Sequence, residues 1–108
     1  MAQVIWTDSA LNDLAKVFDY LTERMQSVDR AEEFCVNLFQ ASVERLQRLP
    51  DSGALVEELA GWQAREIYWN SYRIIYVRKG DACYVNMRIH GSRDLARHID
   101  RDLWDQLP

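Results

Sequence analysis

Three apolar runs separated by two-residue spacers constrain the fold more than any other feature of the sequence. The runs cover residues 65–69, 72–79 and 82–89, and the pairs Asn70-Ser71 and Gly80-Asp81 separate them. Each run is rich in β-branched and aromatic residues, and a two-residue connection suits a hairpin between antiparallel strands. The sequence therefore predicts an antiparallel three-stranded meander over residues 65–89.

The order of polar and apolar positions in these runs predicts how the sheet is covered. In the third run Val85, Met87 and Ile89 share one face by strict alternation, and the polar side chains share the other. The middle run is apolar on both faces, which is typical of a central strand. We therefore expect one sheet face to pack on helices and the other to stay open.

Two amphipathic helices are expected before the meander. Apolar residues recur at helical spacing over about residues 8–25, after a short strand at 4–6, and again up to about residue 49. Thr7 or Asp8 would cap the first helix, and Asp29 with Glu32 would form a capping box for the second. Their short link predicts an antiparallel helical hairpin. Residues 54–62 fit either a short helical turn or irregular structure, and Ser92 would cap a C-terminal helix.

The predicted fold is α+β, with a small antiparallel sheet packed on an N-terminal helical hairpin in the order β-α-α-β-β-β-α. The 108 residues form a single domain, 1–108, long enough for one core without a metal or disulfide. We expect Cys35 and Cys83 to be buried, reduced thiols, and we expect no metal and no cofactor. No apolar stretch approaches a membrane span and no signal peptide is visible, so a cytoplasmic location is expected.

Charge is distributed unevenly along the chain. Residues 1–64 carry five basic and eleven acidic side chains, whereas residues 65–101 carry eight basic and four acidic ones. This asymmetry favours an oriented contact between the basic hairpin and something negative. The net charge of −4 argues against general nucleic-acid affinity, so we expect no direct sequence-specific nucleic-acid binding.

A second apolar set on the second helix leaves two interpretations open. Val36, Phe39 and Val43 lie more than a quarter-turn from the main stripe of that helix. They either widen a buried arc or form a flank that awaits a partner.

Several motifs together resemble the ParE/RelE superfamily of toxins from bacterial type II toxin–antitoxin pairs. They are "IWTDSALNDL" (5–14), "RLPDSGALVEEL" (48–59), "REIYWNSYRIIY" (65–76) and "RIHGSRDL" (88–95). The sequence looks closer to the ParE-like branch. That resemblance implies a toxin that inhibits DNA gyrase, has no established catalytic residues and is neutralised by a cognate antitoxin.

The RelE-like branch implies an alternative, a metal-independent endonuclease that cuts messenger RNA on the ribosome. Arg73 and Arg93 match positions that are basic in both branches, and with His90 they would be the catalytic residues of such a nuclease. The strand before "YR" reads Arg65, Glu66, Ile67 without the lysines of that branch, and no tyrosine follows residue 84. A non-toxic relative that only binds its antitoxin is a third possibility.

Candidate binding residues follow from these readings. For the target we expect the cations and the histidine of the hairpin region: Arg65, Arg73, Arg88, His90 and Arg93. For the antitoxin we expect either the flank of Val36, Phe39 and Val43 or the open sheet face. Arg73 also has a structural interpretation, an ion pair with Glu66 on the neighbouring strand. Arg78 and Lys79 flank a turn and are expected to be solvated.

Overall fold

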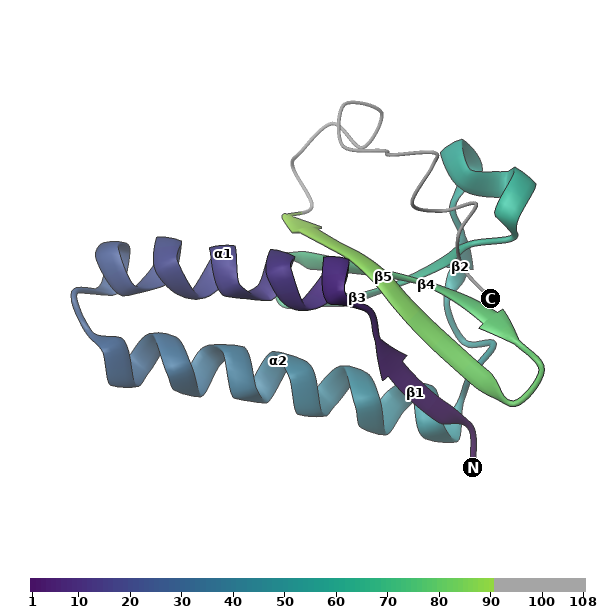
Figure 1. Cartoon of the computed structure of the whole chain (residues 1–108), viewed down its shortest axis with the longest axis horizontal. Coiled ribbons are helices and arrows are strands. Elements are labelled where there is room, and N and C mark those ends of the chain that lie inside the picture. Colours follow the sequence, from purple (N-terminus) through teal and green to yellow (C-terminus); the bar gives the residue numbers. More distant parts are fainter. Residues whose placement is uncertain (91–108) are drawn as a thin grey trace.

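The computed structural model describes residues 1–90 of the chain, with side chains for residues 1–86. Two long helices, α1 (Asp8–Met25) and α2 (Val28–Arg48), form an antiparallel hairpin beside a twisted sheet (Figure 1). This arrangement confirms the predicted α+β class and the helical hairpin. The C-terminal helix expected after Ser92 lies outside the described residues.

The sheet has five strands in the order β1-β5-β4-β3-β2. The strands are β1 (Gln3–Trp6), β2 (Ala54–Leu55), β3 (Arg65–Trp69), β4 (Tyr72–Lys79) and β5 (Ala82–His90). The predicted meander β3-β4-β5 is confirmed, with β4 in the centre. β1 pairs with β5 in parallel. A parallel pair needs a long crossover connection, which the helices and the other strands between β1 and β5 provide.

The two helices begin at hydroxyl caps. The Thr7 hydroxyl accepts a hydrogen bond from the backbone N–H of Ala10 at 3.2 Å, as expected for α1. The prediction that Asp29 caps α2 is wrong, because Ser27 accepts from the backbone N–H of Arg30 at 3.1 Å. Asp29 then lies in the first turn of α2, where a negative charge interacts favourably with the helix dipole.

The main core lies between the helical hairpin and one face of the sheet. It joins residues of both helices, such as Leu21, Leu38 and Leu46, to Ile74 and Tyr76 of β4. A smaller cluster lies on the opposite sheet face, under the short helix η1 (Glu57–Trp62). Its buried members are Val56, Leu59, Ala64, Ile75 and Val77. The expectation of one fully open face is therefore wrong where η1 covers β4.

A bulge interrupts the pairing of β4 with β5. Tyr76 lies opposite Val85, but the preceding residue, Ile75, lies opposite Met87, so Asn86 is an extra residue of β5. The predicted strict alternation through Val85, Met87 and Ile89 therefore does not match the observed register. The alternation of side chains between the two faces of a strand is broken at an inserted residue.

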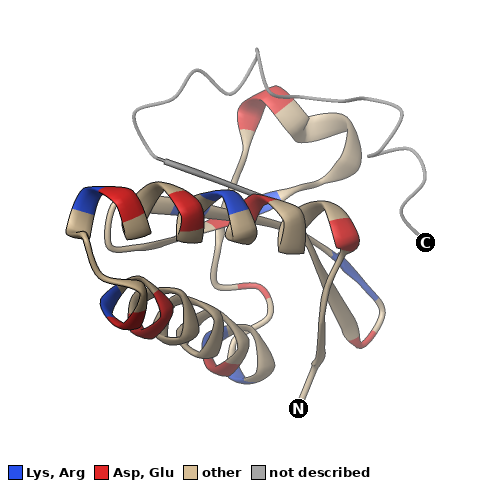
Figure 2. Cartoon of the chain, turned by 60° about the vertical axis from the view of Figure 1, so that its left-hand side comes forward, with Lys and Arg blue, Asp and Glu red and all other residues tan. Residues whose placement is uncertain are grey.

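Neither described helix has the length and apolar composition needed to cross a membrane. Both instead carry Asp, Glu, Lys and Arg at intervals along their length (Figure 2). Nearly all of these charged side chains are exposed, as expected for two amphipathic helices.

Candidate functional site

The two described cations of the predicted target-binding set lie on opposite faces of the sheet. Arg65 lies opposite Tyr76 and alternates with Ile67, so it belongs to the face that packs on the helices. Arg73 alternates with Ile75 and Val77 on the other face. The structure therefore does not bring Arg65 and Arg73 together in one positive patch.

Arg73 is held by a carboxylate of the neighbouring strand. Its guanidinium donates from Nε to Oε2 of Glu66 at 2.8 Å, and Nη2 contacts the same oxygen. The two side chains are only 11% and 13% exposed. The predicted charge partner Glu66 is thus confirmed. An ion pair so shielded from water is screened less by salt than a surface pair.

Tyr68 lies directly opposite Arg73 and was not singled out by the sequence analysis. It is 57% exposed, which makes it a large apolar surface beside the ion pair. The alternation of β3 already places Tyr68 on the same face as Glu66, so its position was available from the sequence. Arg73, Glu66 and Tyr68 together form what we call the second-face triad.

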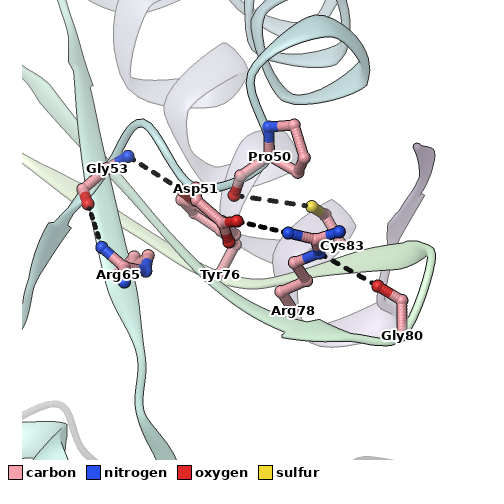
Figure 3. Close-up of polar contacts among 8 residues, drawn as sticks. All are labelled: Pro50, Asp51, Gly53, Arg65, Tyr76, Arg78, Gly80 and Cys83. Carbon is pink, nitrogen blue, oxygen red and sulfur yellow. Dashed lines mark hydrogen bonds and ion pairs between the residues drawn. The ribbon is translucent and has the colours of Figure 1, made fainter. Parts of the chain in front are cut away.

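Arg65 serves a different purpose at the connection between α2 and β2. Its Nη1 donates to the carbonyl of Gly53 at 2.8 Å, and the N–H of Gly53 donates to the Tyr76 hydroxyl at 3.0 Å (Figure 3). The thiol of Cys83 approaches the carbonyl of Pro50 at 4.0 Å. Side chains of three strands thus hold the loop 50–53 on the sheet.

Arg78 also contacts this loop. Its guanidinium forms an ion pair with Asp51, and its Nε donates to the carbonyl of Gly80 at 3.0 Å (Figure 3). Both partners of the ion pair are exposed, so its contribution to stability is small. The expectation that Arg78 and Lys79 are solvent-exposed is confirmed, although Arg78 has an acidic partner.

Burial changes the acidity of two groups near this loop. It raises the pKa of Tyr76 above its ordinary 10.0, although the hydrogen bond from Gly53 acts in the opposite direction. It also raises the pKa of the Cys83 thiol, and the nearby charge of Arg78 opposes that shift. Both groups are therefore neutral near pH 7, which suits structural roles rather than nucleophilic ones.

The remaining residues of the predicted target-binding set lie at the far end of β5 or beyond it. In the backbone register Arg88 is opposite Ile74 and His90 is opposite Tyr72. The side chains of Arg88 and His90, and the whole of Arg93, lie outside the described part of the chain. Their assignment to the target stays a prediction.

The predicted antitoxin-binding flank lies partly against the core. The ring of Phe39 packs against Trp6 with centroids 5.1 Å apart and planes tilted by 47°, and Val43 packs on the same cluster. Only Val36 is exposed, at 45%. Phe39 and Val43 are therefore partly buried against the core, which fits the interpretation as a wide apolar arc, and their assignment to the antitoxin stays a prediction.

The described residues contain no group of three or more His, Cys, Asp or Glu side chains placed to bind a metal ion. Cys35 and Cys83 are both buried, and neither forms a disulfide. What the described surface offers is a shielded ion pair, an exposed tyrosine and a tightly held loop.

Comparison with known proteins agrees with this description. The family model described as "ParE toxin of type II toxin-antitoxin system, parDE" matches residues 4–95. A solved structure described as "Chromosomal ParDE TA system from P. aeruginosa" shares the fold, with a TM-score of 0.65 and 20% sequence identity. The alignment covers 79% of this chain and 90% of that one. A search of curated proteins gives no match. Because the family match spans most of its length, the chain belongs to the ParE toxin family of type II toxin–antitoxin systems.

Proposed function

We propose that this toxin inhibits DNA gyrase through a protein–protein contact and that a cognate antitoxin neutralises it. Family membership supports the toxin–antitoxin pairing. The choice between gyrase inhibition and RNA cleavage needs an observation on the chain itself.

The ion pair between Arg73 and Glu66 favours gyrase inhibition over RNA cleavage. A phosphate-cleaving site needs a cation that is free to meet the charge developing on the phosphate. Here the Arg73 guanidinium contacts Glu66 through two nitrogens, and the carboxylate adds negative charge where a phosphate would approach. Moving Glu66 away would leave a poorly hydrated cation, which is unfavourable. The pair therefore favours a protein target over an RNA phosphate.

The proposed target contact uses the distal part of β5 and the segment after it. Arg88, His90 and Arg93 are its candidate residues, and Arg73 would act there only as part of the second-face triad. Arg65 is assigned to holding the loop 50–53, because its guanidinium already donates to the Gly53 carbonyl.

Purified toxin tests this proposal in two parallel assays. We expect it to block the supercoiling of relaxed plasmid by gyrase, and we expect no new RNA 5′ ends when it is added to a translation extract. Alanine substitution of Arg88 should weaken the inhibition, whereas substitution of exposed Lys79 is the matched control at the turn. Reproducible cleavage inside codons, with gyrase unaffected, would replace this proposal by the nuclease one and make Arg73, His90 and Arg93 catalytic candidates.

The antitoxin is the second proposed partner, and we expect both proteins in the cytoplasm. Two buried cysteines that form no disulfide are in keeping with a reducing compartment. Of the predicted flank, Val36 presents exposed apolar surface, and Tyr68 does so on the sheet. Pull-down of the co-expressed antitoxin with Val36→Asp and Tyr68→Asp variants tests which surface it covers. Full retention by both variants would exclude both surfaces.

A further inference from the structure

The bulge at Asn86 selects between two registers of the β4–β5 hairpin. In the observed register Tyr76 pairs with Val85 and Ile75 pairs with Met87. Without a bulge, Asn86 would lie opposite Ile75, and every later residue of β5 would be displaced by one position against β4. Such a displacement exchanges the two faces of a strand. The bulge therefore determines which residues of β4 lie opposite the last residues of β5, including positions 88 and 90.

Thr7 holds the bulge from the side of β1. Its hydroxyl lies 3.1 Å from Oδ1 of Asn86 and 3.0 Å from the carbonyl of Val85, and its single proton goes to one of these two acceptors. The backbone N–H of Thr7 donates to the same Val85 carbonyl at 3.0 Å. Because Thr7 also caps α1, the bulge is tied to the start of that helix.

Burial makes this contact selective for the bulged register. Asn86 is only 4% exposed, and a buried amide needs hydrogen-bonding partners. In the regular register Asn86 would lie opposite the fully buried Ile75, on the face with the apolar cluster of Val56 and Leu59. An amide there would meet hydrocarbon, so the sequence disfavours the regular pairing.

We propose that Asn86 and Thr7 act as a register latch that positions the distal part of β5 for the toxin's contact with its target. The residues of the latch are positioning residues and need not touch the target. The inference rests on the proposed function in one respect, because the target contact is assigned to that part of β5.

Asn86→Ala tests the latch by two independent measurements. Cross-strand backbone contacts seen by NMR should change from Ile75 with residue 87 to Ile75 with residue 86. If the bulged register falls to about one tenth of molecules, the concentration needed to inhibit gyrase rises about tenfold. The supercoiling assay measures that increase on folded protein.

Deletion of Asn86 is the complementary variant. Removing the extra residue leaves the Tyr76–Val85 and Ile75–Met87 pairs next to each other in a regular ladder, so the latch is no longer required. We expect the deletion to restore the inhibition that Asn86→Ala loses. Ser42→Ala is the matched control, because Ser42 is 1% exposed and its hydroxyl donates to the Phe39 carbonyl at 2.8 Å within α2, away from β5. It should lower stability without changing inhibition by the folded fraction.

The proposal is overturned if Asn86→Ala keeps both the Ile75–Met87 contacts and full inhibition. It is also overturned if Ser42→Ala loses inhibition to the same extent. Should Asn86→Ala not fold, a folded deletion variant that retains the Ile75–Met87 contacts but no longer inhibits gyrase overturns it as well. If the unmodified toxin leaves gyrase unaffected, the proposed function fails, whereas the NMR comparison still decides whether the latch sets the register.

Discussion

Gly53→Ala is the substitution whose effect the structure predicts most directly. A Cβ atom at position 53 would lie 2.7 Å from the backbone carbonyl oxygen of Glu66 and 2.8 Å from the Tyr76 hydroxyl oxygen. Neither neighbour is the free end of a flexible side chain, because one is strand backbone and the other belongs to a ring that is 0% exposed. The loop 50–53 must therefore move away from the sheet.

The magnitude follows from the contacts that this movement breaks. The Gly53 N–H loses its acceptor on Tyr76, and its carbonyl loses the guanidinium of Arg65. One ordinary and one charge-assisted hydrogen bond contribute about 2–4 kcal/mol together, and overpacking a buried site costs about 1–3 kcal/mol. Since part of each is recovered by relaxation, we expect a loss of about 2–4 kcal/mol in the free energy of unfolding.

Urea unfolding followed by tryptophan fluorescence measures this loss, and thermal melting gives a second reading. For a chain of this length each kcal/mol lowers Tm by roughly 4 °C, so the variant should melt about 8–16 °C below the wild type. Gly61→Ala is the matched control, because no atom lies within 4 Å of the added Cβ and the site is exposed. If Gly53→Ala and Gly61→Ala have the same melting temperature, the loop 50–53 is not held on the sheet as described.

Three further perturbations address the core, the ion pair and the buried tyrosine. Phe39→Asp should cost about 3–5 kcal/mol of stability, whereas Val36→Asp on the exposed side of the same helix should change it by less than about 0.5 kcal/mol; equal melting temperatures would contradict the packing described for Phe39. A double-mutant cycle of Glu66→Gln and Arg73→Met, read by urea unfolding, should give a coupling energy of about 1–3 kcal/mol, and a value near zero would show that the pair is not formed in solution. Because burial raises the folded-state pKa of Tyr76 above 10.0, its contribution to stability is complete below that pH and is lost as the pH rises through the folded-state pKa. Above about pH 10 the free energy of unfolding should therefore fall less steeply with pH for Tyr76→Phe than for the wild type. An equal pH dependence in both proteins would show that another group causes the loss of stability.

The sequence predicted most of the elements because their signals are local. Runs of β-branched residues and two-residue spacers place β3 and β4 at the observed residues. The cap of α2 was missed because Ser27 and Asp29 both suit the position, and the choice depends on where the chain leaves α1. The parallel pairing of β1 with β5 joins residues about eighty positions apart, and no local pattern reports such a contact.

The arrangement of the candidate site was harder to predict because it depends on how strands align. Alternation along one strand correctly grouped Arg73 with Ile75, and Arg65 with Ile67. Whether those two groups share a face depends on the cross-strand register, in which Arg73 lies opposite Tyr68 and Arg65 opposite Tyr76. Charge counts along the chain contain no such information. The bulge at Asn86 was missed for the same reason, since it is stabilised by Thr7, the N-cap of α1, which is far away in the sequence.

The structure also changes what the excess of cations in the hairpin means. Arg65 donates to the Gly53 carbonyl, Arg73 to the carboxylate of Glu66, and Arg78 to Asp51 and the Gly80 carbonyl. Each of these guanidiniums therefore has an acceptor within the chain, and two of the acceptors are carboxylates that offset its charge. A long-range field from these three residues is weaker than their number suggests, so steering by them contributes little to partner binding. We therefore expect the proposed contact to depend more on Arg88, His90 and Arg93, and on the register that places them, than on these three arginines. With the register latch proposed above, we expect substitutions at the bulge of β5 to affect inhibition more than substitutions of the arginines of β3 and β4.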